Sequence, residues 1–206
     1  MTRSLLAAAL VMALVPACDD NDDDILVVDP VADTQDEGFA RGDALANDAA
    51  AELTGDDALV VIGKTATILA TLNDNEITQS AFVLGVSDDF ETLDFANTLV
   101  NDHDDANQVL GEGVRGYGVN FIPSTTADQL ASEGNAGFAT LRGTPPDDID
   151  FQFTELQVIN HAEALVLLDE LAIQVGPGAM GDFIADTRVM IQDHLDRASN
   201  LLDDFF

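Results

Sequence analysis

The chain has 206 residues, of which 39 are acidic and 7 are basic, so its formal net charge is −32. Nucleic acid is excluded as a partner, because a phosphate backbone is neutralised by Lys and Arg, and anionic lipid surfaces are disfavoured for the same reason. Hydrophobic residues make up 47% of the chain, which is enough for the core of one domain and argues against a disordered acidic protein.

Two explanations of the acidity remain. The carboxylates could form a surface that binds cations or basic partners, or they could keep the surface hydrated at high salt, where ions screen the self-repulsion. The acids are spread over the whole chain, and Lys64 is the only lysine. This distribution favours adaptation to high salt, as in a halophilic protein, and predicts a stability that rises with salt concentration.

Residues 1–17 have the pattern of a signal peptide. Arg3 supplies the positive start, and the apolar run that follows is shorter than the about 20 residues that span a membrane. The run ends just before Cys18, the only cysteine of the chain, so this segment resembles a bacterial lipobox, in which cleavage leaves a lipidated N-terminal cysteine. An ordinary secretory signal with an incidental cysteine is the alternative.

An acidic tether is expected next, over residues 18–53. The run DDNDDD at 19–24 should extend the chain, because like charges at this density repel one another. Residues 25–53 mix polar and small residues, so we expect a linker there, with a short helix at 43–53. The sequence thus predicts a protein that a lipid anchors to a membrane of the cell envelope, in the outer membrane and periplasm or at the cell surface, with its folded domain at 54–206.

From residue 56 onward the apolar residues recur with a helical period. Acidic residues before each run, and glycines or prolines after it, mark where the helices start and stop. Long helices are expected at residues 57–84, 88–112, 148–175 and 179–204. The crossover at 114–147 is expected to hold one short extra helix, at 125–141. Because no pair of strands with turn chemistry is visible, the predicted fold class is all-α, most simply a four-helix bundle.

Short motifs around the histidines resemble those of one bacterial family. They are Glu76-Ile77, LVNDHDDA around His103, INHAEALVLLDELA around His161 and DHLDRASNLL around His194. Over about residues 56–204 the chain is similar to the ferritin-like family called domain of unknown function 4142, whose members are often labelled exported or outer-membrane proteins. The resemblance implies a ferritin-like helical bundle and an exported location, and it implies no established activity.

The chain has three histidines, His103, His161 and His194, and each lies on the apolar face of an expected helix. Di-iron proteins of the ferritin type use Glu-x-x-His, in which a carboxylate and an imidazole share one helix face. The residues three positions before the histidines are Val100, Val158 and Ile191. A carboxylate-bridged iron pair is therefore not expected, and neither is ferroxidase or oxygenase activity.

Hairpin geometry indicates which histidines can meet, because residues equally distant from the turn between two antiparallel helices lie level. His161 and His194 are about equally far from the turn between their helices, so they should be neighbours. His103 should lie level with Leu69, which places Glu76 roughly 10 Å away along the axis and argues against Glu76 as a ligand. Whether His103 reaches the other two histidines depends on how the hairpins stack, which the crossover leaves open.

Two interpretations of the histidines remain, and they lead to different functions. If the three imidazoles converge, they suit one Zn, Cu or Fe ion. If they do not, each is a neutral core histidine that donates one ring N–H to a neighbour and helps to fix the helix register. The sequence favours the second interpretation, and with it a non-enzymatic envelope lipoprotein that acts by binding or as a structural component. No nucleophile–base pair and no phosphate-binding glycine loop is visible in the sequence.

Overall fold

The computed structural model describes residues 29–206, which fold into helices with no strand in that range. The α-helices are α1 (Pro30–Leu53), α2 (Ala58–Val83), α3 (Phe90–Tyr117), α4 (Thr125–Gly143), α5 (Ile149–Val175) and α6 (Ala179–Asp203), and a short 3-10 turn, η1 (Pro146–Asp148), precedes α5. The expected all-α fold class is confirmed. None of the described helices is long and apolar enough to cross a membrane. The expected signal peptide at 1–17, the lipidation site Cys18 and the acidic run at 19–24 lie outside the described residues.

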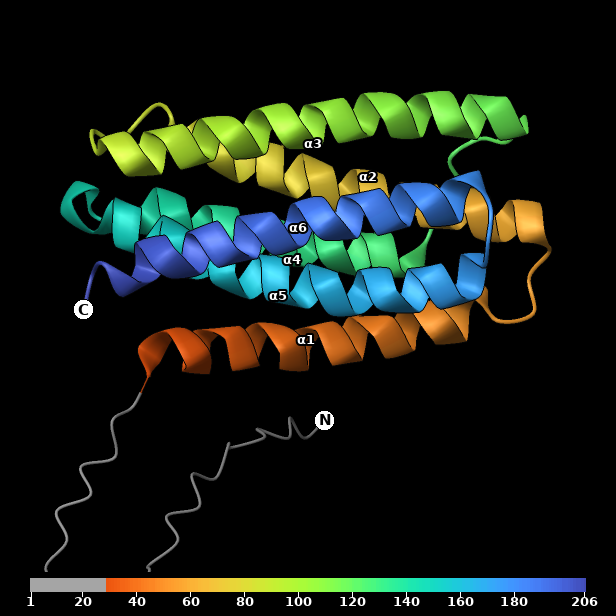
Figure 1. Ribbon diagram of the computed structural model, residues 1–206, viewed down its shortest axis with the longest axis horizontal. Coiled ribbons are helices and arrows are strands. Elements are labelled where there is room, and N and C mark those ends of the chain that lie inside the picture. Colours follow the sequence, from red (N-terminus) through yellow and green to blue (C-terminus); the bar gives the residue numbers. More distant parts are fainter. Residues whose placement is uncertain (1–28) are drawn as a thin grey trace, which may run out of the picture.

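The bundle consists of two antiparallel hairpins and two further helices that cover them (Figure 1). Helix α2 pairs with α3, and α5 pairs with α6, while α2 also contacts α5 and α3 contacts α6. Helix α4 carries the chain from the first hairpin to the second and packs on α2. Helix α1 lies along α5, on the side of the molecule opposite α3. The described range therefore holds six α-helices, which correspond to the four long helices, the crossover helix and the short helix at 43–53 that the sequence predicts, although α1 is longer than expected.

The helix expected at 43–53 is confirmed, but it starts earlier, because residues from Pro30 onward form α1 where a linker was expected. Asp29 caps this helix by accepting hydrogen bonds from two backbone N–H groups of its first turn, at 3.1 and 3.2 Å. The stripe of large apolar side chains that marks a helix in a sequence is missing, because the buried face of α1 consists largely of small residues. Its buried residues are Gly38, Gly42, Leu45, Ala49 and Leu53. Helix α1 thus begins at Pro30 rather than at residue 43.

Two glycines let α1 approach α5 closely. A Cβ atom placed on Gly42 would lie 2.7 Å from the carbonyl oxygen of Glu163 and 2.8 Å from the Cβ atom of Val166. Gly38, one turn earlier, lies against the backbone of Ile159 in the same way. Contact between α1 and α5 is accordingly the most extensive between any two of the described helices. This packing depends on the absence of side chains at two positions that sequence patterns count as helix breakers.

Helix α3 ends later than expected. The sequence predicts an end at residue 112, where a run of glycines begins, whereas the helix continues to Tyr117. A glycine inside a helix costs about 1 kcal/mol relative to alanine, and the burial of Leu110 and Val114 in the core offsets this cost. The helix stops at Gly118, whose φ of 68° is the left-handed conformation that glycine adopts without strain.

The core contains polar residues as well as leucine and phenylalanine side chains. Phe95 of α3 and Phe153 of α5 are fully buried, and their ring centroids are 6.1 Å apart. The buried polar residues of the two hairpins include Asn73, Glu76, Gln79, His103, Gln157, His161 and His194. Buried polar groups cost free energy unless they are hydrogen-bonded, so the partner of each ring nitrogen decides what the histidines can do.

Candidate metal centre

The three histidines converge in the core of the bundle. His103 lies on α3, His161 on α5 and His194 on α6. The ring centroids of His161 and His194 are 5.3 Å apart, as the hairpin geometry predicts. The ring of His103 lies 5.4 Å from that of His194 and 6.1 Å from that of His161, again between centroids. The two hairpins therefore stack so that His103 joins the pair, which the sequence left open.

His161 and His194 each donate one ring N–H to an acceptor. Nδ1 of His161 lies 2.8 Å from the backbone carbonyl oxygen of Gln157, one turn earlier on α5. Nε2 of His194 lies 3.0 Å from Oδ2 of Asp102 on α3. Carbonyl and carboxylate oxygens only accept hydrogen bonds, so these nitrogens carry the proton, and the other nitrogen of each ring has a free lone pair.

His103 is held by α2 in the same manner. Its Nδ1 lies 2.9 Å from Oδ1 of Asn73, whose own Nδ2 donates to Oδ1 of Asn107 at 2.9 Å. Asn73 lies one turn nearer to the α2–α3 connection than Leu69, the residue expected to be level with His103. The correction has a geometric reason, because helical side chains point toward the N-terminus of their own helix. In α3 that direction leads toward the connection.

The remaining three ring nitrogens have no partners. They are Nε2 of His103, Nε2 of His161 and Nδ1 of His194, and all are buried and unbonded among the described residues. One ligand nitrogen from each ring lies within 4.8 Å of those of the other two. A buried polar atom without a partner costs about 1–3 kcal/mol, so three together are unfavourable unless something binds between them. A role in fixing the helix register would explain the hydrogen bond of one nitrogen in each ring, but it would leave the other nitrogen of each ring without a partner.

Burial keeps the three rings neutral. It lowers the pKa of His161 from 6.5 to about 3, with a further contribution from the nearby His194, and it lowers the pKa of His103 well below the usual value. Burial also lowers the pKa of His194, although the hydrogen bond from its ring to Asp102 and the charge of that carboxylate oppose the shift. Neutral imidazoles need no deprotonation before they coordinate a metal ion.

Glu76 of α2 is buried but does not join the histidines. Its carboxylate accepts a hydrogen bond from Nδ2 of Asn160 at 3.1 Å, and burial raises its pKa to about 7. Within residues 29–206, the group of converging ligand atoms consists of the three histidines and includes no carboxylate. Glu76 is therefore not a ligand in the candidate site, as the sequence predicts.

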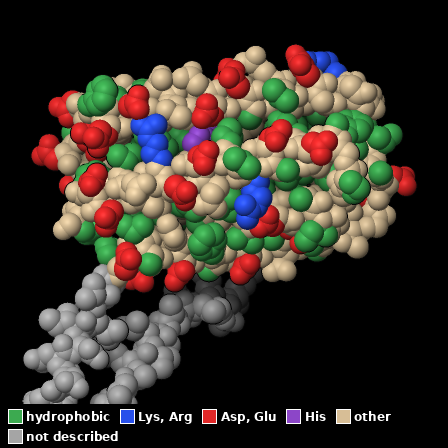
Figure 2. Space-filling model, viewed as in Figure 1, with side chains coloured by type: hydrophobic (Ala, Val, Ile, Leu, Met, Phe, Trp, Pro, Cys, Tyr) green, Lys and Arg blue, Asp and Glu red, His purple; other side chains and the backbone are tan. Residues whose placement is uncertain are grey.

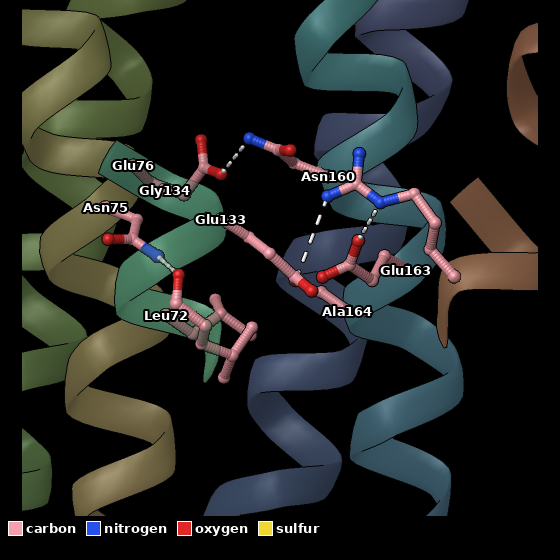
Figure 3. A pocket seen from close by; sticks show the side chains of 10 residues that line it. Leu72, Asn75, Glu76, Glu133, Gly134, Asn160, Glu163 and Ala164 are labelled. Carbon is pink, nitrogen blue, oxygen red and sulfur yellow. Dashed lines mark hydrogen bonds and ion pairs between the residues drawn. The ribbon is translucent and has the colours of Figure 1, made fainter. Parts of the chain in front are cut away.

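A small cavity next to Glu76 lies between α1, α2, α4 and α5 (Figure 3). Its volume of about 20 Å³ is room for one water molecule. Arg41 of α1 pairs there with Glu163 at 2.8 Å and lies 3.9 Å from Glu133. Burial raises the pKa of Glu163 to about 7, against the opposing charge of Arg41. The guanidinium group makes this cavity unsuited to a metal ion, although three carboxylates line it.

Sequence reasoning missed the groups that orient the rings, namely Asn73, Gln157 and Asp102. A signal existed for Gln157, because a buried histidine on a helix has the carbonyl four residues earlier within reach of its Nδ1. Asp102 precedes His103 in the sequence yet bonds to His194, so its role depends on how the hairpins stack. Nothing in the sequence pattern relates Asn73 to His103.

A family model described as domain of unknown function (DUF4142) matches residues 43–201. The chain belongs to the DUF4142 family. The match begins inside α1, at residue 43, so the DUF4142 domain includes the helix that was expected at 43–53. All three histidines and the residues that orient them lie within the DUF4142 match. No curated protein and no solved structure matches the chain.

Proposed function

We propose that this protein binds one transition-metal ion between His103, His161 and His194. The observation that carries the proposal is the set of three buried ring nitrogens that lie close together without partners. Each ring is held through its other nitrogen by an amide, carbonyl or carboxylate oxygen. Such a hydrogen bond is what fixes the tautomer and the orientation of histidines that bind metals.

Three imidazoles suit a mononuclear Zn, Cu or Fe ion. Metal–nitrogen bonds of about 2.0–2.1 Å at tetrahedral angles hold the nitrogens roughly 3.4 Å apart. The rings, whose nitrogens lie within 4.8 Å of one another, would thus move slightly inward on binding. A fourth coordination position stays open for water or a small ligand. The two hairpins joined by a crossover also support the ferritin-like relationship that the motifs imply. The proposed site differs from that of the di-iron proteins, because its ligands are three histidines and no carboxylate.

A buried cation needs negative charge close by. Asp102 supplies it through the ring of His194, to which it is bonded at 3.0 Å. We propose metal binding rather than catalysis, since the described residues beside the histidines offer no nucleophile with its base.

We also propose that a lipid on Cys18 holds the bundle at the cell envelope. The apolar run that ends just before the only cysteine, and the acidic run after it, support this proposal. Labelled palmitate should be incorporated when the full chain is expressed in a bacterial host, and Cys18→Ser should abolish the label. A wild-type chain that takes up no label would contradict the anchor.

Calorimetric titration tests the metal site. Protein freed of metal and titrated with Zn²⁺ or Cu²⁺ in high salt should bind one equivalent tightly, and His161→Ala should lose this binding. Thr154→Ala is the matched control, because it removes a buried polar group from the same helix two turns away and should keep the site. Thermal unfolding of each variant establishes that it is folded. If the wild-type protein binds no ion, the histidines are structural and the proposal fails.

A further inference from the structure

A groove of about 630 Å³ lies between α3 and α6, and His194 is among the residues that line it. The two helices belong to different hairpins and lie side by side on this face (Figure 1). On the same face, acidic side chains lie around a small area of histidine (Figure 2). His103 is 0% exposed and His161 is 1% exposed, so neither is accessible, whereas His194 is 4% exposed.

The groove is negatively charged. Its carboxylates are those of Asp102, Asp105, Asp186 and Asp193. The only cationic side chain in the lining is Arg197, whose Nη2 donates a hydrogen bond to Oδ2 of Asp94 at 2.6 Å. This pairing neutralises Arg197, so the groove has a surplus of negative charge. A concave acidic surface raises the local concentration of cations and the rate at which they associate.

The ring of His194 separates the groove from the metal centre. Its Nε2 bonds to Asp102, which lines the groove and has a side chain that is 43% exposed. Its Nδ1 is one of the three unpartnered nitrogens. Rotation of this one ring would therefore open a path from the groove to the other two histidines. The cavity beside Glu76 offers no such path, because it holds an arginine side chain and room for about one water molecule.

We propose that the α3–α6 groove is the port through which a hydrated divalent cation reaches the three histidines, with the Asp102–His194 pair as its gate. This inference rests on the proposed metal site. The carboxylates of the groove attract the ion, and Asp102 is the carboxylate that the ion contacts next to the ring of His194. The imidazole of His194 then turns, and the three free nitrogens replace water molecules of the hydration shell. The ion leaves by the same path.

Binding kinetics of Co²⁺, followed by its visible absorption in a stopped-flow instrument, test the port. Val189→Trp places a bulky side chain in the groove at a position that is 62% exposed, so the fold should tolerate it. Association and dissociation of Co²⁺ should both become slower by about the same factor, with an unchanged dissociation constant. Ile173→Trp is the matched control, at a 72% exposed position of α5 outside the groove, and should bind Co²⁺ at the wild-type rate.

Asp-to-Asn variants test whether the negative charge of the groove speeds the association of the ion. Changing Asp105, Asp186 and Asp193 together to Asn should slow association about tenfold at low salt, and the difference should vanish near molar salt. The same change at Asp36, Asp43 and Asp48, exposed acids of α1, should have little effect. If both groove variants bind one equivalent of Co²⁺ at the wild-type rate, the ion takes another route and the port is wrong while the site stands. If the wild-type protein binds no Co²⁺, site and port fail together.

Discussion

At the scale of single residues, what distinguishes the histidines is which of their nitrogens have partners. The sequence placed all three on buried helix faces and excluded the Glu-x-x-His arrangement, because the residues three positions earlier are aliphatic. It could not indicate that three lone pairs converge, since this depends on side-chain directions and on contacts between helices far apart in the chain. Asn73 shows the difficulty, because it lies one turn from the position that backbone geometry alone indicates for the partner of His103.

The low pKa of the histidines leads to a prediction about metal affinity. Protons compete with a metal ion only below the pKa of the folded, metal-free ligand, and burial has lowered that pKa to about 3 for His161. The Zn²⁺ affinity should therefore be nearly the same at pH 7.5 and pH 5.5. Three exposed imidazoles with the ordinary pKa of about 6.5 would lose on the order of 1,000-fold over that range. Calorimetric titrations at the two pH values measure the difference, and a loss of that size would contradict the assigned burial.

At the scale of helices, the sequence located the two hairpins well but only the last part of α1, at residues 43–53. The hairpin helices carry large apolar residues at helical spacing, and glycine or acidic residues mark most of their ends. The first part of helix α1 buries small residues instead, so a pattern based on large side chains cannot reveal its full length. Glycine is a poor helix former in sequence patterns, whereas Gly38 and Gly42 allow close contact with α5.

Glycine-to-alanine substitutions at two positions should have opposite effects on stability. Gly42→Ala should lower the free energy of unfolding by about 1–3 kcal/mol, because the new Cβ atom would lie 2.7 Å from the carbonyl oxygen of Glu163 and would push α1 away from α5. Gly113→Ala, in α3 with no atom near the new Cβ, should raise it by up to about 1 kcal/mol. Urea unfolding of both variants measures the difference. Equal effects would mean that α1 does not pack on α5 as described.

At the scale of the whole molecule, 39 acidic residues stand against 7 basic ones, so water and ions must solvate the excess negative charge. The fold class follows from the helical periodicity, but the stacking of one hairpin on the other does not. A crossover of about 30 residues permits more than one arrangement, and α4 fixes the observed one by packing on α2. The convergence of the histidines, and with it the candidate site, becomes visible only at this scale.

Salt should stabilise the molecule. Self-repulsion at a net charge of −32 opposes the compact state, and added ions screen it. The melting temperature should therefore rise between dilute buffer and molar KCl, and it should rise in the metal-free protein as well as in the loaded one. A melting temperature that is the same in both solutions would remove the support for adaptation to high salt.

The acidic surface also offers many weak sites for cations, so the most direct test of the three-histidine centre identifies the atoms around the bound ion. X-ray absorption at the zinc edge of protein loaded with one equivalent does this. The account predicts three imidazole nitrogens at about 2.0–2.1 Å, with the outer-shell scattering of imidazole rings and one further light atom. A shell of oxygen atoms without imidazole scattering would place the ion on surface carboxylates and contradict the central claim.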